Sequence, residues 1–223
     1  MRARKRLRVI TDLVDLPNAV IADIGADHGF LSKMLIDEGR ASKVIATDIS
    51  APSLQKTIDL VKQYNLEEKI ECRVGDGLTP IEKNEVDLAV IAGMGGFEII
   101  NILETSKGLG VKNFIFQPVQ NTVDLRKYLV KNKFNIVKDF IICDKNKFYN
   151  TIQVEGVQDK YKASELDVEF GKDNVRFGGE DFKIYLEKYI LNCKAIIIKS
   201  SDNVVFNEKL LKALGLYQKL YNK

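Results

Sequence analysis

The sequence predicts an α/β fold in which a doubly wound, mostly parallel sheet is followed by an α-helical hairpin. Short apolar strands alternate with helical segments over residues 20–132, which is typical of a parallel sheet with crossover helices. Several strands end in turns of acidic residues and glycine, and such a sheet gathers its strand ends on one ligand-binding edge. Beyond residue 180, two amphipathic segments flank a short polar break, as in an antiparallel helical hairpin.

Size and composition fit one sizeable domain with a smaller appendage. The chain has 223 residues, of which 45% are hydrophobic and 29% charged, as in a folded globular protein. No apolar run approaches the roughly 20 residues that span a bilayer, and the basic N-terminus lacks the apolar core of a secretion signal. Three scattered cysteines and a single histidine argue against a disulfide framework or a metal site. We expect a cytoplasmic monomer without a metal ion or a membrane partner.

The first half of the chain contains most of the alternation. An amphipathic helix over residues 4–16 ends at Pro17, and a buried strand over about 20–24 follows. The elements expected next are a helix at about 28–38 closed by Gly39, a strand at 43–48, a helix at 51–64 capped by Ser50, strands at 69–74 and 86–92, and a helix through about Glu104.

The second half begins with the same alternation and then changes character. A strand at 113–117 and a helix at 122–132 precede two strands, 134–143 and 147–155, which a turn-rich segment joins into an antiparallel pair. Residues 159–179 are polar and show no clear period. We expect a first domain over residues 1–156 and a coiled-coil-like helical domain over 157–223, whose helices cover 180–200 and 204–221.

The stretch from Val20 to Leu31 is the centre of the expected binding site. A strand ends at Asp23, Gly25 permits a close approach of a ligand to the main chain, and a helix opens near Asp27. The G-x-G-x-x-G pattern of dinucleotide folds is broken. Carboxylates at this turn would repel the phosphates of a nicotinamide cofactor and attract the sulfonium and ammonium groups of S-adenosylmethionine.

Two further acids follow the next strands. Asp48 ends the second strand, where a carboxylate accepts hydrogen bonds from both ribose hydroxyls, and Ile49 follows it. Asp76 ends the third strand and can meet the adenine amino group, while Gly77 leaves room for the ring. Each acid alone would be read as a helix cap or a turn residue. As an ordered set with Asp23 they predict an S-adenosylmethionine site.

The turns after the fourth and fifth strands are candidates for the target pocket. Ala92-Gly93-Met94-Gly95-Gly96 replaces the Asn/Asp-Pro-Pro-aromatic motif of many amino-group methyltransferases, and small residues there can bring backbone groups near cofactor and substrate. The same glycines could instead serve a tight helix start. Gln117-Pro118 is the second candidate.

A basic cluster marks the start of the chain, and it contains no acidic residue. Such a cluster fits phosphate contacts or, equally, a solvated first helix turn. Its members are Arg2, Arg4, Lys5, Arg6 and Arg8.

These motifs together resemble the bacterial TrmK family of tRNA (adenine-22-N1)-methyltransferases. The resemblance covers about residues 4–155 and continues in architecture through the helical hairpin. Val119 stands where the family has Asn after its Gln-Pro pair, and Gly29-Phe30 stands where it often has Ala-Tyr. The matching pieces are Arg6-Leu7, Ala22-Asp23-Ile24-Gly25-Ala26-Asp27-His28, Gly75-Asp76-Gly77-Leu78, Ile91-Ala92-Gly93-Met94-Gly95-Gly96 and Gln117-Pro118, with weaker support from Asp48-Ile49, Arg126 and Leu129.

The resemblance implies a Rossmann-like class I methyltransferase with a seven-stranded sheet that methylates adenine N1 in the D-arm region of tRNA. Asp27 is the expected catalytic carboxylate, and His28 contributes to the reaction or braces the turn. The cofactor, S-adenosylmethionine, leaves as S-adenosylhomocysteine. Its expected contacts are Asp23, Gly25, Asp27, His28, Asp48, Ile49, Asp76, Gly77, Ala92, Gly93 and Met94, and the expected RNA contacts are Arg4, Lys5, Arg6, Gly95, Gln117 and Pro118.

Three alternatives remain open from the sequence. The chain could methylate another RNA or a small molecule, since the missing Asn-Pro-Pro-aromatic motif does not name the target. It could be a cofactor-binding RNA-binding protein without turnover, which binding in the absence of methylation would reveal. It could also be a nicotinamide dehydrogenase, which a titration with both cofactors would distinguish.

Overall fold

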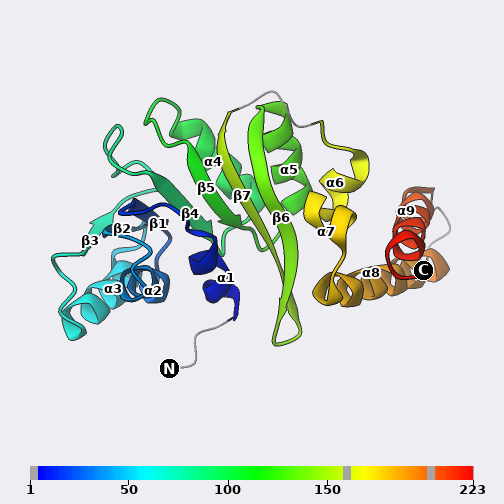
Figure 1. Cartoon of the computed structure of the whole chain (residues 1–223), viewed down its shortest axis with the longest axis horizontal. Coiled ribbons are helices and arrows are strands. Elements are labelled where there is room, and N and C mark those ends of the chain that lie inside the picture. Colours follow the sequence, from blue (N-terminus) through cyan, green and yellow to red (C-terminus); the bar gives the residue numbers. More distant parts are fainter. Residues whose placement is uncertain (1–4, 158–161, 200–203, 223) are drawn as a thin grey trace.

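The described residues form one mixed sheet with helices on both faces (Figure 1). The computed structural model describes residues 5–157, 162–199 and 204–222. Neighbouring strands pair in parallel from β3 to β5, whereas β7 runs antiparallel to both β5 and β6. The seven strands lie in the order β3-β2-β1-β4-β5-β7-β6 and comprise Val20–Ile24 (β1), Lys43–Asp48 (β2), Ile70–Val74 (β3), Leu88–Ala92 (β4), Asn113–Gln117 (β5), Phe134–Asp144 (β6) and Lys147–Val157 (β7).

Two apolar cores lie on opposite faces of this sheet. One joins Leu7 and Ile10 of α1 to Leu35 of α2 and Val61 of α3, and the other joins Ile99 of α4 to the sheet. Strand residues buried on both faces explain the continuous apolar runs of the central strands. The covering helices are Lys5–Leu13 (α1), Phe30–Asp37 (α2), Ala51–Gln63 (α3), Gly96–Thr105 (α4) and Thr122–Lys131 (α5).

The expected doubly wound sheet is confirmed, with small differences at element ends. The first helix ends at Leu13, three residues before the expected Leu16, and the second begins at Phe30 because Gly29 adopts the left-handed conformation as its N-cap. Ser50 caps α3 as expected, with its hydroxyl accepting from the Ser53 amide at 3.3 Å. Arg4 lies outside the described residues.

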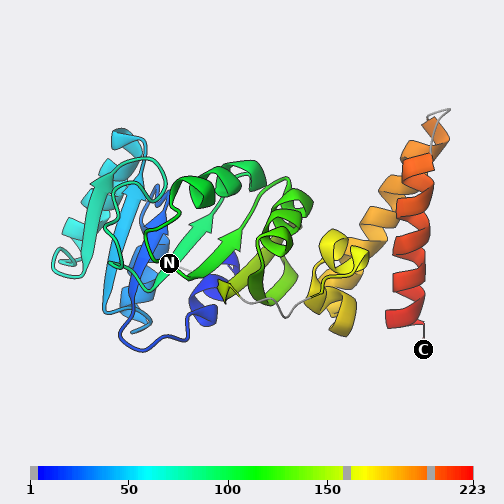
Figure 2. The same cartoon turned by 90° about the horizontal axis from the view of Figure 1, so that it is seen from above.

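The C-terminal part contains two short helices that sequence periodicity missed. Helices α6 (Glu165–Phe170) and α7 (Lys172–Phe177) occupy a stretch expected to be irregular, because six residues are too few to show a helical period. Beyond them, α8 (Glu180–Lys199) and α9 (Val204–Tyr221) form the expected hairpin at one end of the molecule (Figure 2). The expected break at residues 201–203 lies outside the described part.

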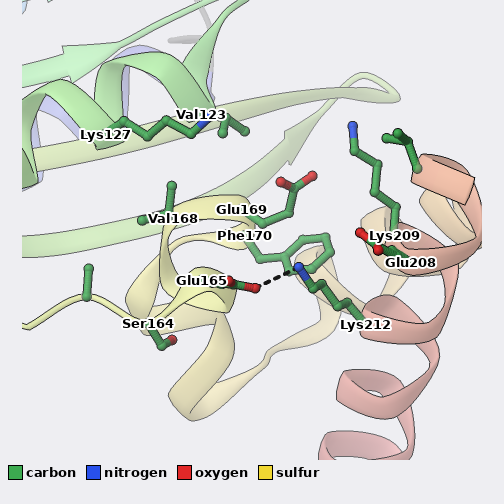
Figure 3. A pocket seen from close by; sticks show the side chains of 12 residues that line it. Val123, Lys127, Ser164, Glu165, Val168, Glu169, Phe170, Glu208, Lys209 and Lys212 are labelled. Carbon is green, nitrogen blue, oxygen red and sulfur yellow. Dashed lines mark hydrogen bonds and ion pairs between the residues drawn. The ribbon is translucent and has the colours of Figure 1, made fainter.

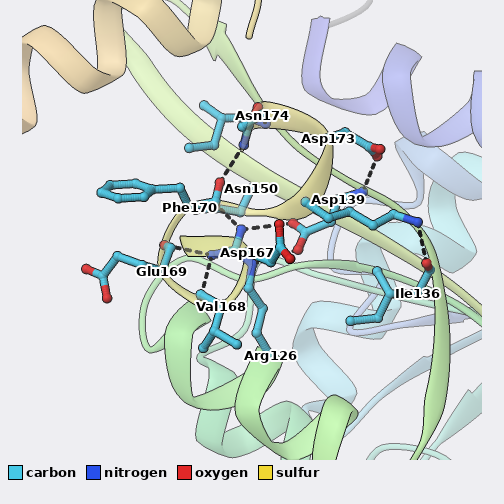
Figure 4. A network of polar contacts seen from close by, with 12 residues as sticks. Arg126, Ile136, Asp139, Asn150, Asp167, Val168, Glu169, Phe170, Asp173 and Asn174 are labelled. Carbon is cyan, nitrogen blue, oxygen red and sulfur yellow. Dashed lines mark hydrogen bonds and ion pairs between the residues drawn. The ribbon is translucent and has the colours of Figure 1, made fainter. Parts of the chain in front are cut away.

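A buried polar network attaches these helices to the sheet (Figure 4). The guanidinium of Arg126 on α5 makes two hydrogen bonds to the Asp139 carboxylate on β6, at 2.8 and 2.9 Å, and both side chains are 2% exposed. The same guanidinium donates to the carbonyl oxygens of Val168 and Glu169 at the end of α6, at 3.4 and 3.2 Å. A buried charge that is paired in this way fixes the orientation of its neighbours. Phe170 and Phe182 add an apolar contact behind it.

Candidate active site

A cavity of about 330 Å³ opens where β1 and β4 end. It lies at the edge where the sequence placed the binding site, because the carboxyl ends of parallel strands meet there. The loops after β1 and β4 contribute to its walls, together with the first turns of α1 and α2. The lining residues are Arg6, Leu7, Asp23, Gly25, Ala26, Asp27, His28, Phe30, Leu31, Ala92 and Gly93.

Asp23 is the buried carboxylate of this cavity. Its side chain is 4% exposed, and the Ser32 hydroxyl donates a hydrogen bond of 2.6 Å to it. Burial raises the pKa of Asp23 from 3.8 to about 6, and the hydrogen bonds from Ser32 oppose that rise. No basic side chain of residues 5–157, 162–199 or 204–222 forms an ion pair with it. The cavity therefore has a negative wall suited to a cationic ligand.

The turn after β1 takes a shape that requires glycine. Gly25 has a φ of +73°, and its amide donates to the Thr47 carbonyl at 2.8 Å. A Cβ at this position would lie 2.5 Å from Cε of Met94, so the thioether of Met94 packs directly over the turn. Main chain is thus accessible to a ligand once the flexible Met94 side chain moves aside.

Asp27 and His28 stand on the exposed rim of the cavity. The Asp27 carboxylate accepts from Lys56 Nζ at 2.9 Å and lies 3.5 Å from His28 Nε2. The imidazole of His28 stacks on the Phe30 ring, with 5.5 Å between the ring centroids. The Asp27 carboxylate is therefore held by a lysine of α3, and the histidine lies between it and the Phe30 ring.

Asp48 and Asp76 lie beyond this cavity, at the ends of β2 and β3. Asp48 accepts hydrogen bonds from the amides of Asp27 and Ser50, at 3.3 and 2.8 Å, so it is continuous with the first turn. Asp76 is exposed, and the side chain of Ile49 is 70% exposed. The order of the strands places the acids in a row that leads from Asp23 toward the β3 edge.

Gly77, after β3, and Gly93, after β4, differ in what surrounds them. A Cβ on Gly77 would lie 2.8 Å from Ile102 of α4, so packing and a φ of +54° require this glycine. The expected room for an adenine ring stays a prediction. At Gly93, by contrast, a Cβ would meet nothing within 4 Å, and this residue does line the cavity.

Gln117 is buried beside the cavity and does not line it. Its amide donates to the Arg6 carbonyl and to the Thr151 hydroxyl, both at 3.3 Å, and accepts from Arg6 Nη1 at 3.4 Å. Pro118 is also outside the cavity lining, and Gly95 pairs with Gln120 in an isolated bridge. Lys5 forms an ion pair of 2.6 Å with Asp181 of α8.

Sequence reasoning missed several partners of the site. Ser32, on the helix that follows β1, donates to Asp23, whereas Lys56 and Tyr149 contact Asp27 and Arg6 from elements remote in the chain. Ser32 gave one weak signal, as a polar residue at helical spacing from the apolar Leu35 and Ile36. Nothing in the sequence singled out the other two.

A second cavity, of about 430 Å³, separates α5 from the C-terminal helices (Figure 3). Lys127 faces it from α5, and Lys209 and Lys212 face it from α9. Lys212 pairs with Glu165 at 2.7 Å, whereas neither Lys127 nor Lys209 forms an ion pair within the described part of the chain. Val123, Val168 and Phe170 supply its apolar wall.

Two kinds of feature are absent from the described ranges. No described helix is long and apolar enough to cross a membrane. The same residues contain no group of three or more His, Cys, Asp and Glu side chains placed to hold a metal ion. All three cysteines are free thiols.

Comparison with known proteins identifies relatives among tRNA methyltransferases. The family model TrmK, described as tRNA (adenine(22)-N(1))-methyltransferase, matches residues 21–217. The Bacillus subtilis (strain 168) tRNA (adenine(22)-N(1))-methyltransferase is 34% identical over 158 residues, which are 70% of this chain and 66% of the relative. The aligned region thus spans just under two thirds of that relative's length.

Solved structures extend the likeness to nearly the whole chain. Streptococcus pneumoniae Sp1610 in complex with S-adenosyl-L-methionine is 29% identical, with a TM-score of 0.86, over 95% of this chain and 98% of that chain. The B. subtilis m1A22 tRNA methyltransferase TrmK is 27% identical, with a TM-score of 0.80, over 98% of this chain and 96% of that chain. Coverage this high extends beyond the sheet to the C-terminal helices.

Proposed function

Because the chain belongs to the TrmK family of tRNA (adenine(22)-N(1))-methyltransferases, we infer that it methylates N1 of adenine 22 in tRNA with S-adenosylmethionine. The observation that carries this beyond family membership is the cavity at the end of β1, where a buried carboxylate without an ion-pair partner among the described residues lies beside a glycine turn. A cationic cofactor would supply the positive partner that the Asp23 carboxylate lacks.

The described residues fit S-adenosylmethionine better than a nicotinamide dinucleotide. The carboxylates of Asp23 and Asp27 repel a pyrophosphate and attract a sulfonium. Gly25 and Gly93 have no side chain, so a ligand can approach the main chain there. We assign Asp48 to the ribose and Asp76 to the adenine. The other proposed contacts are His28, Ile49, Gly77, Ala92 and Met94.

The chemistry needs positioning more than base catalysis. S-adenosylmethionine supplies an electrophilic methyl group. Adenine N1 uses its lone pair to form the new N–C bond, the S–C bond breaks toward sulfur, and the adenine gains a positive charge. N1 lies on the Watson–Crick edge, so the base must be unpaired or flipped into the site.

Asp27 is the proposed catalytic residue. Its exposed carboxylate on the rim can stabilise the positive charge that develops on adenine. Lys56 holds this carboxylate in place at 2.9 Å, and His28 braces the turn. Lys56 is thus a positioning residue, and a base arriving over the cavity would meet an already oriented acid.

Basic residues on both sides of the cavity between α5 and α9 bind the RNA. We divide the chain into a cofactor-binding domain over residues 1–156 and a helical, RNA-contacting domain over 157–223. Lys127 and Lys209 line the second cavity from opposite sides and can contact phosphates there (Figure 3). Arg4, Lys5 and Gly95 are further proposed RNA contacts, and Gln117 and Pro118 support the pocket of the reacting base.

The enzyme acts as a monomer in the cytoplasm. Free thiols at all three cysteines fit a reducing compartment. Light scattering on the purified protein tests the monomer, since a stable dimer would contradict it.

The function is tested by incubating the protein with labelled S-adenosylmethionine and unmodified tRNA, followed by nucleoside analysis. We expect 1-methyladenosine at position 22 alone. A tRNA with guanine at that position serves as the matched control and should remain unlabelled. Cofactor binding without methylated tRNA would refute the tRNA substrate and leave a cofactor-binding protein.

A further inference from the structure

We propose that Arg6 binds the carboxylate of the cofactor's amino-acid moiety, and that Gln117 positions Arg6 for this task. The inference rests on the proposed function, since it assumes that the cavity at the end of β1 holds S-adenosylmethionine. It assigns to the cofactor a residue that the sequence suggested as an RNA contact. The position of Arg6 and the charges that surround it support this assignment.

Arg6 lies at the amino-acid end of the site. The acids suited to ribose and adenine, Asp48 and Asp76, follow β2 and β3, on one side of β1. The cavity that Arg6 lines extends to the other side, toward Ala92 and Gly93 at the end of β4. With the adenosine directed toward β3, the methionine portion must occupy the cavity between β1 and β4.

The charges of the cavity match those of a methionine zwitterion. The moiety carries a sulfonium, an ammonium and a carboxylate, so it needs negative partners and one positive partner. Asp23 and Asp27 supply the negative charge, and Arg6 is the one Lys or Arg among the described residues that line the cavity. A guanidinium offers a carboxylate two parallel hydrogen bonds.

The guanidinium of Arg6 is held but not neutralised. It donates one long hydrogen bond, 3.4 Å, to Gln117 Oε1, and it lies 5.7 Å from the centroid of the Tyr149 ring. No acid of residues 5–157, 162–199 or 204–222 forms an ion pair with it. Most of its N–H donors therefore remain for an anionic group.

Gln117 fixes this arginine through both ends of its amide. The nitrogen donates to the Arg6 carbonyl at 3.3 Å while the oxygen accepts from the Arg6 guanidinium, and Thr151 orients the amide from behind. Gln117 is fully buried, so it reaches a ligand through Arg6 rather than directly. Because α1 and β5 are remote in sequence, this contact also anchors the first turn of α1 against the sheet.

The test compares two ligands that differ in one group. S-adenosylhomocysteine carries the carboxylate, and its decarboxylated analogue, S-(5′-adenosyl)-3-thiopropylamine, keeps the ammonium, the sulfur and the adenosine. Binding of both to wild type and Arg6→Gln is measured by calorimetry without RNA. A charge-assisted contact predicts about 30-fold weaker binding of S-adenosylhomocysteine to the variant and nearly unchanged binding of the analogue.

Two more variants separate positioning from folding. Gln117→Met keeps the volume but loses the amide, and it should weaken S-adenosylhomocysteine binding less than Arg6→Gln does, with no added loss in the double variant. Arg8→Gln is the matched control on the same helix, because Arg8 pairs with Glu38 at 2.5 Å and does not line the cavity. Thermal unfolding with and without ligand verifies that each variant is folded.

The outcomes separate the inference from the proposed function. Equal loss for both ligands in Arg6→Gln would overturn the carboxylate contact, as would unchanged cofactor affinity with a raised KM for tRNA. The second result would assign Arg6 to the RNA. Additive losses in the double variant would overturn the role of Gln117. Failure of the wild-type protein to bind S-adenosylhomocysteine would overturn the proposed function itself.

Discussion

The Ser32 hydroxyl donates a 2.6 Å hydrogen bond to the carboxylate of Asp23, and no positive charge of the described residues accompanies it. Burial raises the pKa of Asp23 from 3.8 to about 6. The side-chain and backbone hydrogen bonds of Ser32 stabilise the ionised form only in part. A cationic group of the ligand can stabilise the ionised carboxylate further.

Cofactor affinity should rise with pH through the pKa of Asp23. A cationic ligand binds the ionised carboxylate, so binding releases a proton below about pH 6, and the affinity for S-adenosylmethionine should increase about tenfold from about pH 5 to pH 7. Calorimetry in buffers of different ionisation enthalpy measures both quantities. In Asp23→Asn the affinity should be low and independent of pH, and Asp59→Asn on the surface of α3 is the control. A wild-type affinity that is flat over this range would contradict the role of Asp23.

The stability of the ligand-free protein should respond in the opposite direction. Because the pKa of Asp23 is raised on folding, the stabilising effect of its protonated form is fully present below about pH 4 and is lost as the pH rises through about 6. Asp23→Asn should therefore unfold at a higher temperature than wild type at pH 7.5, by a margin that shrinks toward pH 4. Differential scanning calorimetry decides this, and a less stable variant at pH 7.5 would contradict the prediction.

Arg126 should contribute strongly to stability through its buried pair. Removing it leaves Asp139 buried without a partner and frees the carbonyl groups at the end of α6. Arg126→Met should lower the free energy of unfolding by about 3–5 kcal/mol. Hydrogen exchange should increase first in α6 and α7, the helices that the guanidinium attaches to the sheet. Urea unfolding measures the loss.

An exposed ion pair of α6 provides the contrast. Lys212 and Glu165 also link α6 to another helix, but their side chains are 44% and 82% exposed. Lys212→Gln should leave the unfolding midpoint unchanged within error, since exposed pairs are screened by water and salt. If Arg126→Met also left the unfolding midpoint unchanged, the network in Figure 4 would not hold the C-terminal helices.

The sheet could be predicted from the sequence because its strands are apolar on both faces and its helices are amphipathic. Val20–Ile24 and Leu88–Ala92 show this continuous apolar pattern, and the acid-and-glycine turns mark where the strands end. Helices α6 and α7 could not be predicted. The capping of α6 by Ser164 and Asp167 is local, but the position of α6 depends on Arg126, a contact that no periodicity records.

The acidic residues of the candidate site could be predicted from the sequence, whereas the side chains that contact them from other elements could not. Asp23 lies near the end of an otherwise apolar strand and Asp27 in the turn after it, so their common location could be deduced from chain order. Lys56 and Gln117 reach the site from distant elements, and only the folded chain reveals these contacts. Gln117 was expected to face the substrate, yet it is buried behind Arg6.

Substitutions at two glycines should separate backbone strain from steric clash. A Cβ added at Gly39, whose φ is +65°, would meet nothing within 4 Å, whereas one added at Gly77, whose φ is +54°, would lie 2.8 Å from Ile102. Gly39→Ala should cost about 1 kcal/mol of stability from the left-handed conformation alone. Gly77→Ala should cost about 2–4 kcal/mol because overpacking is added. Equal losses in urea unfolding would show that Ile102 moves aside freely.

The carboxylate of Asp27, on the rim of the cavity, should act on the chemical step. Asp27→Asn keeps the shape of the turn and removes the negative charge that stabilises the cationic adenine, so kcat for tRNA methylation should fall about 100-fold or more. The affinity for S-adenosylhomocysteine, measured separately, should change only a few-fold. Lys56→Gln should give a smaller loss of kcat, since it leaves the charge but releases the carboxylate from its 2.9 Å contact.

The pair of variants distinguishes catalysis from cofactor binding. If Asp27 serves only to bind the cofactor, Asp27→Asn should raise the dissociation constant and leave kcat at saturating S-adenosylmethionine near the wild-type value. If it is catalytic, the reverse holds, and the double variant with Lys56→Gln should be no slower than Asp27→Asn alone, because the lysine acts through this carboxylate. A slower double variant would mean that Lys56 contacts the substrate itself.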